Sequence, residues 1–316
     1  MGSLPGAGEA QVDEATGLIS GRDRPIEVLA PIIGRGQSLG DALRQALHDQ
    51  ADACAALTPC AQGRTPAHIH ALRKRTRQTR ALVRLCGTCL VGDKPVKQAL
   101  RDLASAARLL SAARDAEVLP DALGLLPMPL RSKTPQLALA LAVQRAAAAV
   151  DPDNVAKVAV AAQAIATATR DFAALLPAVV PPRVLMDGLR AALGRVRDGR
   201  KQARKRPRPE AIHDLRKACK DLRHQLEWLG VDGDHALYGE LVATIKALGE
   251  LTDLFALDLW LRANGRSCPQ AETAAVGRAL EKAYARTAGK LIGRCKGVVP
   301  DKPRKMAPAL LAELGW

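Results

Sequence analysis

The chain has 316 residues, of which 48% are hydrophobic and 25% charged, so it falls among globular proteins and outside the disordered, collagen-like and membrane-embedded classes. Its 47 Lys and Arg against 32 Asp and Glu give a formal net charge of +15, which favours a polyanionic partner: nucleic acid, polyphosphate, an acidic protein or an anionic membrane. Aromatic residues are only 2% of the chain, so the core must be packed from Ala, Leu and Val, which favours closely spaced helices.

The chain begins with a polar segment and then turns helical. Residues 1–24 are rich in Gly and polar groups without period, which predicts a mobile tail. Ser38 is the expected N-cap of a first helix, because apolar residues follow it at helical spacing. Thr-Pro opens a second helix over residues 65–89, since Pro suits the first helical turn. A third helix is expected over residues 93–122.

Prolines divide the rest of the first part. After a Pro-rich break at residues 126–131, Ala-rich helical stretches are expected over residues 134–149 and 153–176, with no strand-like alternation between them. A Pro-Pro pair at residues 181–182 then marks a boundary.

The part after this boundary repeats the part before it. Three pairs of segments match in the same order, 146, 143 and 138 residues apart: 41–47 with 187–193, His70-Ala-Leu-Arg-Lys with His213-Asp-Leu-Arg-Lys, and 110–115 with 248–253. The sequence therefore predicts an all-α protein made by tandem duplication, with a first half over residues 25–180 and a second half over residues 181–316. Each half is expected to form a four-helix bundle.

The second helix of each half carries cations along one face. At 100° per residue, the basic residues fall within an arc of about 80°. They are His70, Arg73, Arg77, Arg80 and Arg84 in the first half, and His213, Arg216, Lys220 and Arg223 in the second. In the second half Leu215, Leu222, Leu226 and Leu229 occupy the opposite arc, which predicts a core-facing side. From Arg64 to Arg84 there are seven basic residues and no acid. Because like charges at helical spacing repel one another, this pattern favours a face that binds an anionic ligand.

Neighbouring helices extend the predicted basic site. Its further members are Lys74, Arg101, Arg108, Arg114, Arg190, Arg197, Lys201, Arg204, Lys217 and Lys246. Asp115 and Asp253 sit at matching positions of the two halves, where we expect them to orient neighbouring cations by ion pairing rather than to bind a metal.

The two motifs His70-x-x-Arg73-x-x-x-Arg77-x-x-Arg80 and His213-x-x-Arg216-x-x-x-Lys220-x-x-Arg223, each followed by an Arg-Asp or Thr-Asp element, resemble the halves of the conserved histidine α-helical domain, abbreviated CHAD. The resemblance covers about residues 25–300. It departs from the family pattern at Gln78, where a second consecutive basic residue is common, and at His224, where an aromatic is usual.

Membership of this family implies two four-helix bundles related by a pseudo-two-fold axis. Basic helices would line a central groove or pore that binds inorganic polyphosphate. The ExExK signature of the triphosphate-tunnel domain that often precedes the CHAD domain is absent, so a stand-alone copy is expected. Arg can grip phosphate oxygens with two hydrogen bonds, and an anionic ligand would favour the protonated form of His70 and His213.

Two other functions remain open at this point. A general polyanion or RNA-binding protein would show the same charge, and weak nucleic-acid binding at low salt is expected in any case, although the aromatic residues are not interleaved with the basic stripes. A metal-dependent enzyme that processes polyphosphate would need clustered carboxylates or a Gly-rich phosphate loop, and neither pattern is found. The sequence favours a non-catalytic binding module without a cofactor or metal.

The seven cysteines do not form the dense disulfide framework of small secreted proteins, which favours location in the reducing cytoplasm. If the ligand is polyphosphate, association with polyphosphate-containing granules is also expected. Cys86-Gly-Thr-Cys89 is interpreted as two incidental cysteines, because no second CxxC accompanies it. The N-terminus does not resemble a signal peptide, and the apolar runs are too short to span a membrane.

Overall fold

The computed structural model describes residues 32–34, 36–57, 65–150, 152–299 and 305–316, and every regular element in these ranges is helical. The predicted tail, residues 1–24, lies outside them. The α-helices are α1 (Leu39–Ala55), α2 (Thr65–Cys86), α3 (Lys94–Arg108), α4 (Ser111–Gly124), α5 (Met128–Arg131), α6 (Pro135–Val150), α7 (Pro152–Ala174), α8 (Arg183–Lys205), α9 (Pro209–Trp228), α10 (Ala236–Asn264), α11 (Gln270–Val298) and α12 (Met306–Glu313). The all-α class is confirmed. None of the described helices is long and apolar enough to cross a membrane.

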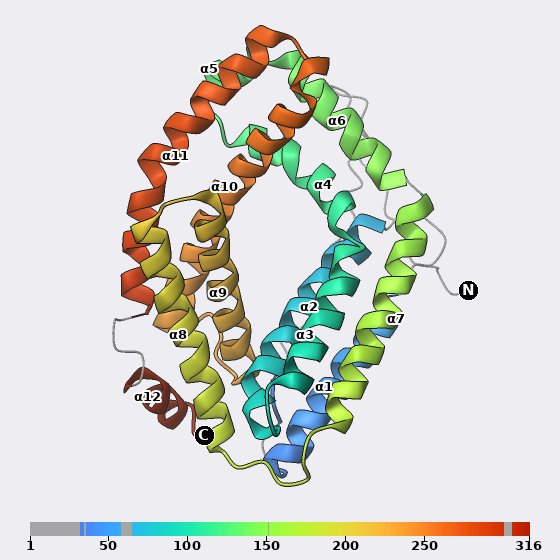
Figure 1. Ribbon diagram of the computed structural model, residues 1–316, viewed down its shortest axis with the longest axis vertical. Coiled ribbons are helices and arrows are strands. Elements are labelled where there is room, and N and C mark those ends of the chain that lie inside the picture. Colours follow the sequence, from blue (N-terminus) through green and yellow to red (C-terminus); the bar gives the residue numbers. More distant parts are fainter. Residues whose placement is uncertain (1–31, 35, 58–64, 151, 300–304) are drawn as a thin grey trace, which may run out of the picture.

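The helices form an elongated frame with two long sides (Figure 1). Helices α1, α2, α3 and α7 pack together on one side, and α8, α9, α10 and α11 pack together on the other. The sides meet where α2 contacts α8 and α9, and again where α4 contacts α10. Residues far apart in the sequence therefore lie next to each other along α2 and α9.

Several predicted helix boundaries are confirmed. The Ser38 Oγ accepts a hydrogen bond from the Asp41 backbone N–H at 3.2 Å, which caps α1 as expected.

The predicted helix over residues 93–122 is wrong, because α3 ends at Arg108 and α4 begins at Ser111. The N–H groups of Leu109 and Leu110 bond to carbonyls only three residues earlier, so the chain tightens and changes direction there. The Pro-rich break contains the short helix α5.

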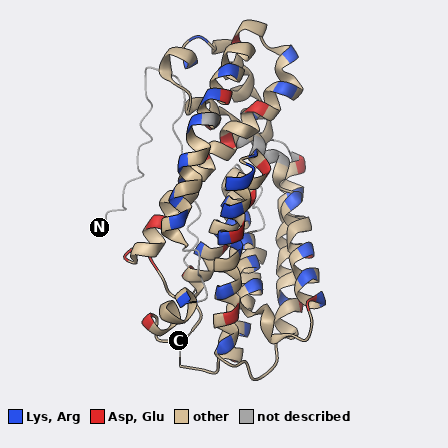
Figure 2. Cartoon of the chain, turned by 60° about the vertical axis from the view of Figure 1, so that its left-hand side comes forward, with Lys and Arg blue, Asp and Glu red and all other residues tan. Residues whose placement is uncertain are grey.

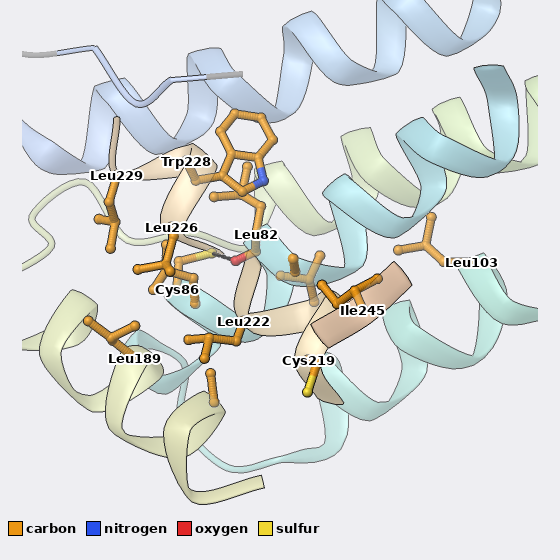
Figure 3. Close-up of a cluster of buried hydrophobic side chains, with 14 of the residues drawn as sticks. Leu82, Cys86, Leu103, Leu189, Cys219, Leu222, Leu226, Trp228, Leu229 and Ile245 are labelled. Atoms are coloured by element: carbon orange, nitrogen blue, oxygen red, sulfur yellow. Dashed lines mark hydrogen bonds between the residues drawn. The ribbon is translucent and has the colours of Figure 1, made fainter. Parts of the chain in front are cut away.

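The hydrophobic core joins α2 to α9 (Figure 3). The predicted apolar side of α9 is confirmed, since Leu215, Leu222, Leu226 and Leu229 are fully buried. Trp228 is 1% exposed, and its indole N–H donates to the Gln78 carbonyl across the interface at 2.9 Å. The two basic helices are therefore fixed to each other through their apolar sides.

Helix α8 approaches the backbone of α2 very closely at Gly188. A Cβ atom at this position would lie 2.1 Å from the Leu85 carbonyl oxygen, so only glycine fits. This contact brings the side chains of α8 to the end of the basic face of α2.

The Cys86–Cys89 pair adds to packing rather than to a reactive site. Both cysteines are free, and burial raises the pKa of the Cys86 thiol well above its usual range. The Cys86 Sγ donates to the Leu82 carbonyl at 3.1 Å (Figure 3), as a buried thiol in a helix does.

Candidate functional site

The basic faces of α2 and α9 open into one pocket of about 550 Å³. Eight Lys and Arg side chains line it against three Asp, so the wall is strongly cationic. The basic residues are Arg73, Arg77, Arg80 and Arg84 of α2, Arg195 of α8, and Arg216, Lys217 and Lys220 of α9. The acids are Asp198, Asp214 and Asp221. Figure 2 shows how far Lys and Arg outnumber Asp and Glu along the helices.

Arg73 is hydrogen-bonded to the chain at the break between α3 and α4, which interrupts the helix predicted over residues 93–122. Its Nη1 donates to the carbonyls of Ala107 and Leu110, at 3.5 and 3.3 Å, at the end of α3. Carbonyls at a helix C-terminus lack partners within the helix and carry partial negative charge, which suits a guanidinium. The break between α3 and α4 thus supplies the acceptors that orient Arg73 at the pocket.

Arg216 is oriented in a similar way by α10. Its Nη1 donates to the Thr252 Oγ1 at 2.6 Å and lies 3.6 Å from the Asp253 carboxylate. The expected role of Asp253 in orienting a cation is confirmed, and that cation belongs to α9. Gly249 leaves room for the guanidinium, because a Cβ there would lie 2.8 Å from the Arg216 Nη2.

Asp221 joins the three helices that form the pocket. Its carboxylate accepts hydrogen bonds from the Arg84 Nη1 at 2.8 Å and from the Arg195 Nη2 at 3.0 Å. The Asp221 side chain is 13% exposed. Sequence reasoning missed both Asp221 and Arg195, because neither lies on a predicted basic stripe and the partners are far apart in the chain.

Arg80 lines the pocket and differs from Arg84 and Arg195, which share the Asp221 carboxylate. Burial lowers the pKa of its guanidinium, the Arg84 charge lowers it further, and the Asp221 carboxylate opposes them. Its Nε is buried without an acceptor, and its guanidinium has no salt bridge within the described part of the chain. Because a buried charged donor without an acceptor is unfavourable, a bound anion would stabilise this side chain.

A hydrogen-bonded network lies behind the pocket. His224, which lines the pocket and is 1% exposed, donates from Nδ1 to the Glu227 carboxylate at 2.6 Å, since a carboxylate can only accept. Burial lowers the pKa of His224 against the opposing effect of this hydrogen bond. The Tyr238 hydroxyl also donates to Glu227, at 2.7 Å, and the Arg223 Nε lies 3.1 Å from the same oxygen. This network fixes the orientation of the His224 imidazole.

Burial alone would raise the pKa of Glu227, but the hydrogen bonds from His224 and Tyr238 and the charge of Arg223 bring it down to about 2. Burial, with the Glu227 hydrogen bond, raises the pKa of Tyr238 to about 12, so the phenol keeps its proton. The carboxylate is therefore ionised and fully used as an acceptor.

The structure brings some of the predicted site residues together and leaves others apart. The pocket lining includes His213 and all the predicted cations of α2 and α9 except His70, Lys74 and Arg223. Outside it, His70, Arg101, Arg108, Lys201, Arg204 and Lys246 are exposed, and Lys74, Arg190 and Arg197 are partly buried. Arg223 is turned to Glu227. The side chains of Arg114 and Asp115 lie outside the described residues.

On α8 the pocket is lined by a cation that the sequence analysis did not single out. The predicted stripe of Arg190, Arg197, Lys201 and Arg204 is not part of the pocket lining, and Arg195 lines it instead. Arg195 is rotated by about 140° from Arg190 on a helical wheel. Arg190 and Arg197 lie beside Asp187 and Asp198, at 3.6 and 2.8 Å, in partly exposed ion pairs.

Comparison with known proteins adds a family match. The family model described as the CHAD domain matches residues 41–262, a range that contains every residue lining the pocket. The crystal structure of the CHAD domain from the plant Ricinus communis matches with a TM-score of 0.49 and 19% sequence identity, over 93% of this chain and 97% of that chain. No curated protein matches the chain.

Proposed function

The chain belongs to the CHAD domain family, and on that premise we propose that it is a non-catalytic module that binds inorganic polyphosphate in the pocket between α2, α8 and α9. The observation that carries the proposal is the convergence of eight Lys and Arg side chains from three helices on one pocket with only three Asp.

The chemistry of the pocket suits a bare phosphate chain. Such a ligand has about one negative charge per phosphate and no base, so its affinity comes from charge-assisted hydrogen bonds and from the release of counterions. Arg80 offers a buried donor without an acceptor, and Arg77 and Lys220 line the same wall. A phosphate segment in the pocket would supply an acceptor for Arg80, and the polyphosphate could continue over the exposed cations outside the pocket.

The pocket lining also disfavours a ligand that must be recognised by its bases. Sequence-tolerant binding of single-stranded RNA uses aromatic side chains as stacking surfaces. No Phe, Tyr or Trp is among the described residues that line the pocket, and Trp228, the aromatic nearest to it in the sequence, is buried in the core. We therefore propose polyphosphate rather than RNA as the preferred ligand.

We also propose that the site arose by duplication, with halves over residues 25–180 and 181–316. Arg73 and Arg216 each lie three residues after a histidine of the repeated motif. Each donates hydrogen bonds to the helix that follows its own, Arg73 to the end of α3 and Arg216 to Thr252 of α10. This parallel supports two related bundles that each contribute one basic helix.

The test removes four pocket cations at once. The variant R73A/R77A/R216A/K220A should bind long-chain polyphosphate at least about 100-fold more weakly at about 0.15 M salt, since hydrogen bonds to charged groups contribute about 1.5–3 kcal/mol each. The matched control R145A/R262A/R286A/K290A removes the same residue types from exposed positions of α6, α10 and α11. The control should lose less than about fivefold. Equal losses in two variants of unchanged helicity would refute the site.

A further inference from the structure

The three aspartates of the pocket differ in what they bind. Asp214 pairs with Lys217 on its own helix at 2.6 Å, and both side chains are more than half exposed. Asp198 pairs with its sequence neighbour Arg197 at 2.8 Å and is also exposed. These two pairs are local and open to solvent, so each contributes little to the arrangement of the helices.

Asp221 is different because it is largely shielded from solvent and links two other helices. It is 13% exposed, and its two carboxylate oxygens accept from Arg84 of α2 and Arg195 of α8. Each guanidinium has five N–H donors and gives one of them to an Asp221 oxygen, so further donors remain for a ligand. Both arginines line the pocket.

We propose, on the basis of the proposed function, that Asp221 is a positioning residue, which holds Arg84 and Arg195 together as a two-arginine fork for phosphate at the junction of α2, α8 and α9. The carboxylate does not touch the ligand. It keeps the two guanidiniums close enough to bind neighbouring phosphate oxygens. Without the carboxylate, the repulsion between the two positive charges would separate them.

The electrostatic environment supports this assignment. Burial lowers the pKa of Arg195, the Asp221 carboxylate raises it, and the Arg84 charge lowers it again. Arg80 feels the same Asp221 and Arg84 charges. One carboxylate thus lies among three guanidiniums, and its removal would leave them to repel one another.

Positioning and simple charge give opposite expectations for loss of this acid. If Asp221 only reduces the positive potential, replacing it with the isosteric Asn would tighten polyanion binding. If it positions the fork, the same substitution separates the two arginines and weakens binding. The sign of the effect therefore decides between them.

The experiment measures long-chain polyphosphate affinity over a series of salt concentrations for wild type, D221N, D198N and D214N. We expect D221N to bind about tenfold more weakly, or about 1.4 kcal/mol, with a lower slope of log affinity against log salt, because fewer cations engage phosphate. D198N and D214N should bind more tightly, because they lose only a repulsive charge. Tighter binding by all three variants would overturn the proposal.

A double-mutant cycle separates positioning from a loss of folding. R195Q should weaken binding, and R195Q/D221N should lose no more than R195Q alone, since Asp221 then has only one arginine left to hold. The double variant removes both members of the partly buried Arg195–Asp221 pair, which is less destabilising than removing one. Tighter binding on adding D221N to R195Q would contradict positioning. If wild type itself does not bind polyphosphate, the proposed function fails; if it binds and D221N tightens, only the role of Asp221 fails.

Discussion

Substituting Gly188 by Ala tests the close packing of α8 on α2 that brings Arg195 to Arg84. A Cβ at Gly188 would lie 2.1 Å from the Leu85 carbonyl oxygen, and this atom belongs to the backbone and cannot rotate away. The two helices must therefore separate. Overpacking of this kind costs about 1–3 kcal/mol, and the gain in helix propensity from Gly to Ala offsets at most about 1 kcal/mol of it.

Gly194 provides the matched control on the same helix. A Cβ there has nothing within 4 Å, so G194A should stabilise the protein by up to about 1 kcal/mol through helix propensity alone. G188A should destabilise it by about 2 kcal/mol and weaken polyphosphate binding by separating the arginine fork. The free energy of unfolding is measured by urea denaturation with far-UV circular dichroism. A G188A variant as stable as G194A would refute the reasoning.

Three further substitutions test the site and its supports. G249A should weaken polyphosphate binding by about threefold to tenfold, because a Cβ would lie 2.8 Å from the Arg216 Nη2, while stability stays level or rises; unchanged affinity in a titration would contradict this. E227Q should flatten the acid part of the stability profile. A carboxylate whose folded pKa is about 2 adds stability above its unfolded value of 4.5 and loses it as the pH falls toward 2, so denaturation curves of variant and wild type should converge there. W228F should destabilise by about 0.5–1.5 kcal/mol, because it removes the indole hydrogen bond to the Gln78 backbone carbonyl between α9 and α2, and a melting temperature equal to that of wild type would argue against it.

Much of the fold could be predicted from the sequence because it depends on local patterns. The N-cap at Ser38 and the Thr-Pro pair at the start of α2 are local signals, and the structure confirms the helices that they begin. The apolar side of α9 follows from helical periodicity and is confirmed by burial. The resemblance to the CHAD family is confirmed by the family model.

The parts that the sequence did not predict depend on contacts between distant residues. The break between α3 and α4 occurs within a continuous helical pattern, and the carbonyls there bond to Arg73 of α2. Asp221 lies beside the basic stripe of its own helix, and its partners are 137 and 26 residues away. Periodicity shows which side chains share a face, but not which other helix that face meets.

The same limit explains the outcome for α8. Four cations at helical spacing predicted a basic stripe on α8, and with Gly188 packed on α2 the α8 cation that lines the pocket is Arg195, which lies outside this stripe. The presence of a glycine in a helix does not show which other helix packs against it. The orientation of α8 about its axis therefore could not be predicted from the spacing of its charged residues.

The preference for a bare phosphate chain is tested most directly by competition at about 0.15 M ionic strength between long-chain polyphosphate and single-stranded RNA of equal phosphate count. The account predicts that polyphosphate binds at least tenfold more tightly, a difference of about 1.4 kcal/mol, because the described pocket lining offers guanidiniums and no stacking surface. RNA binding as tightly as polyphosphate, or more tightly, would contradict it and make the site a general polyanion surface.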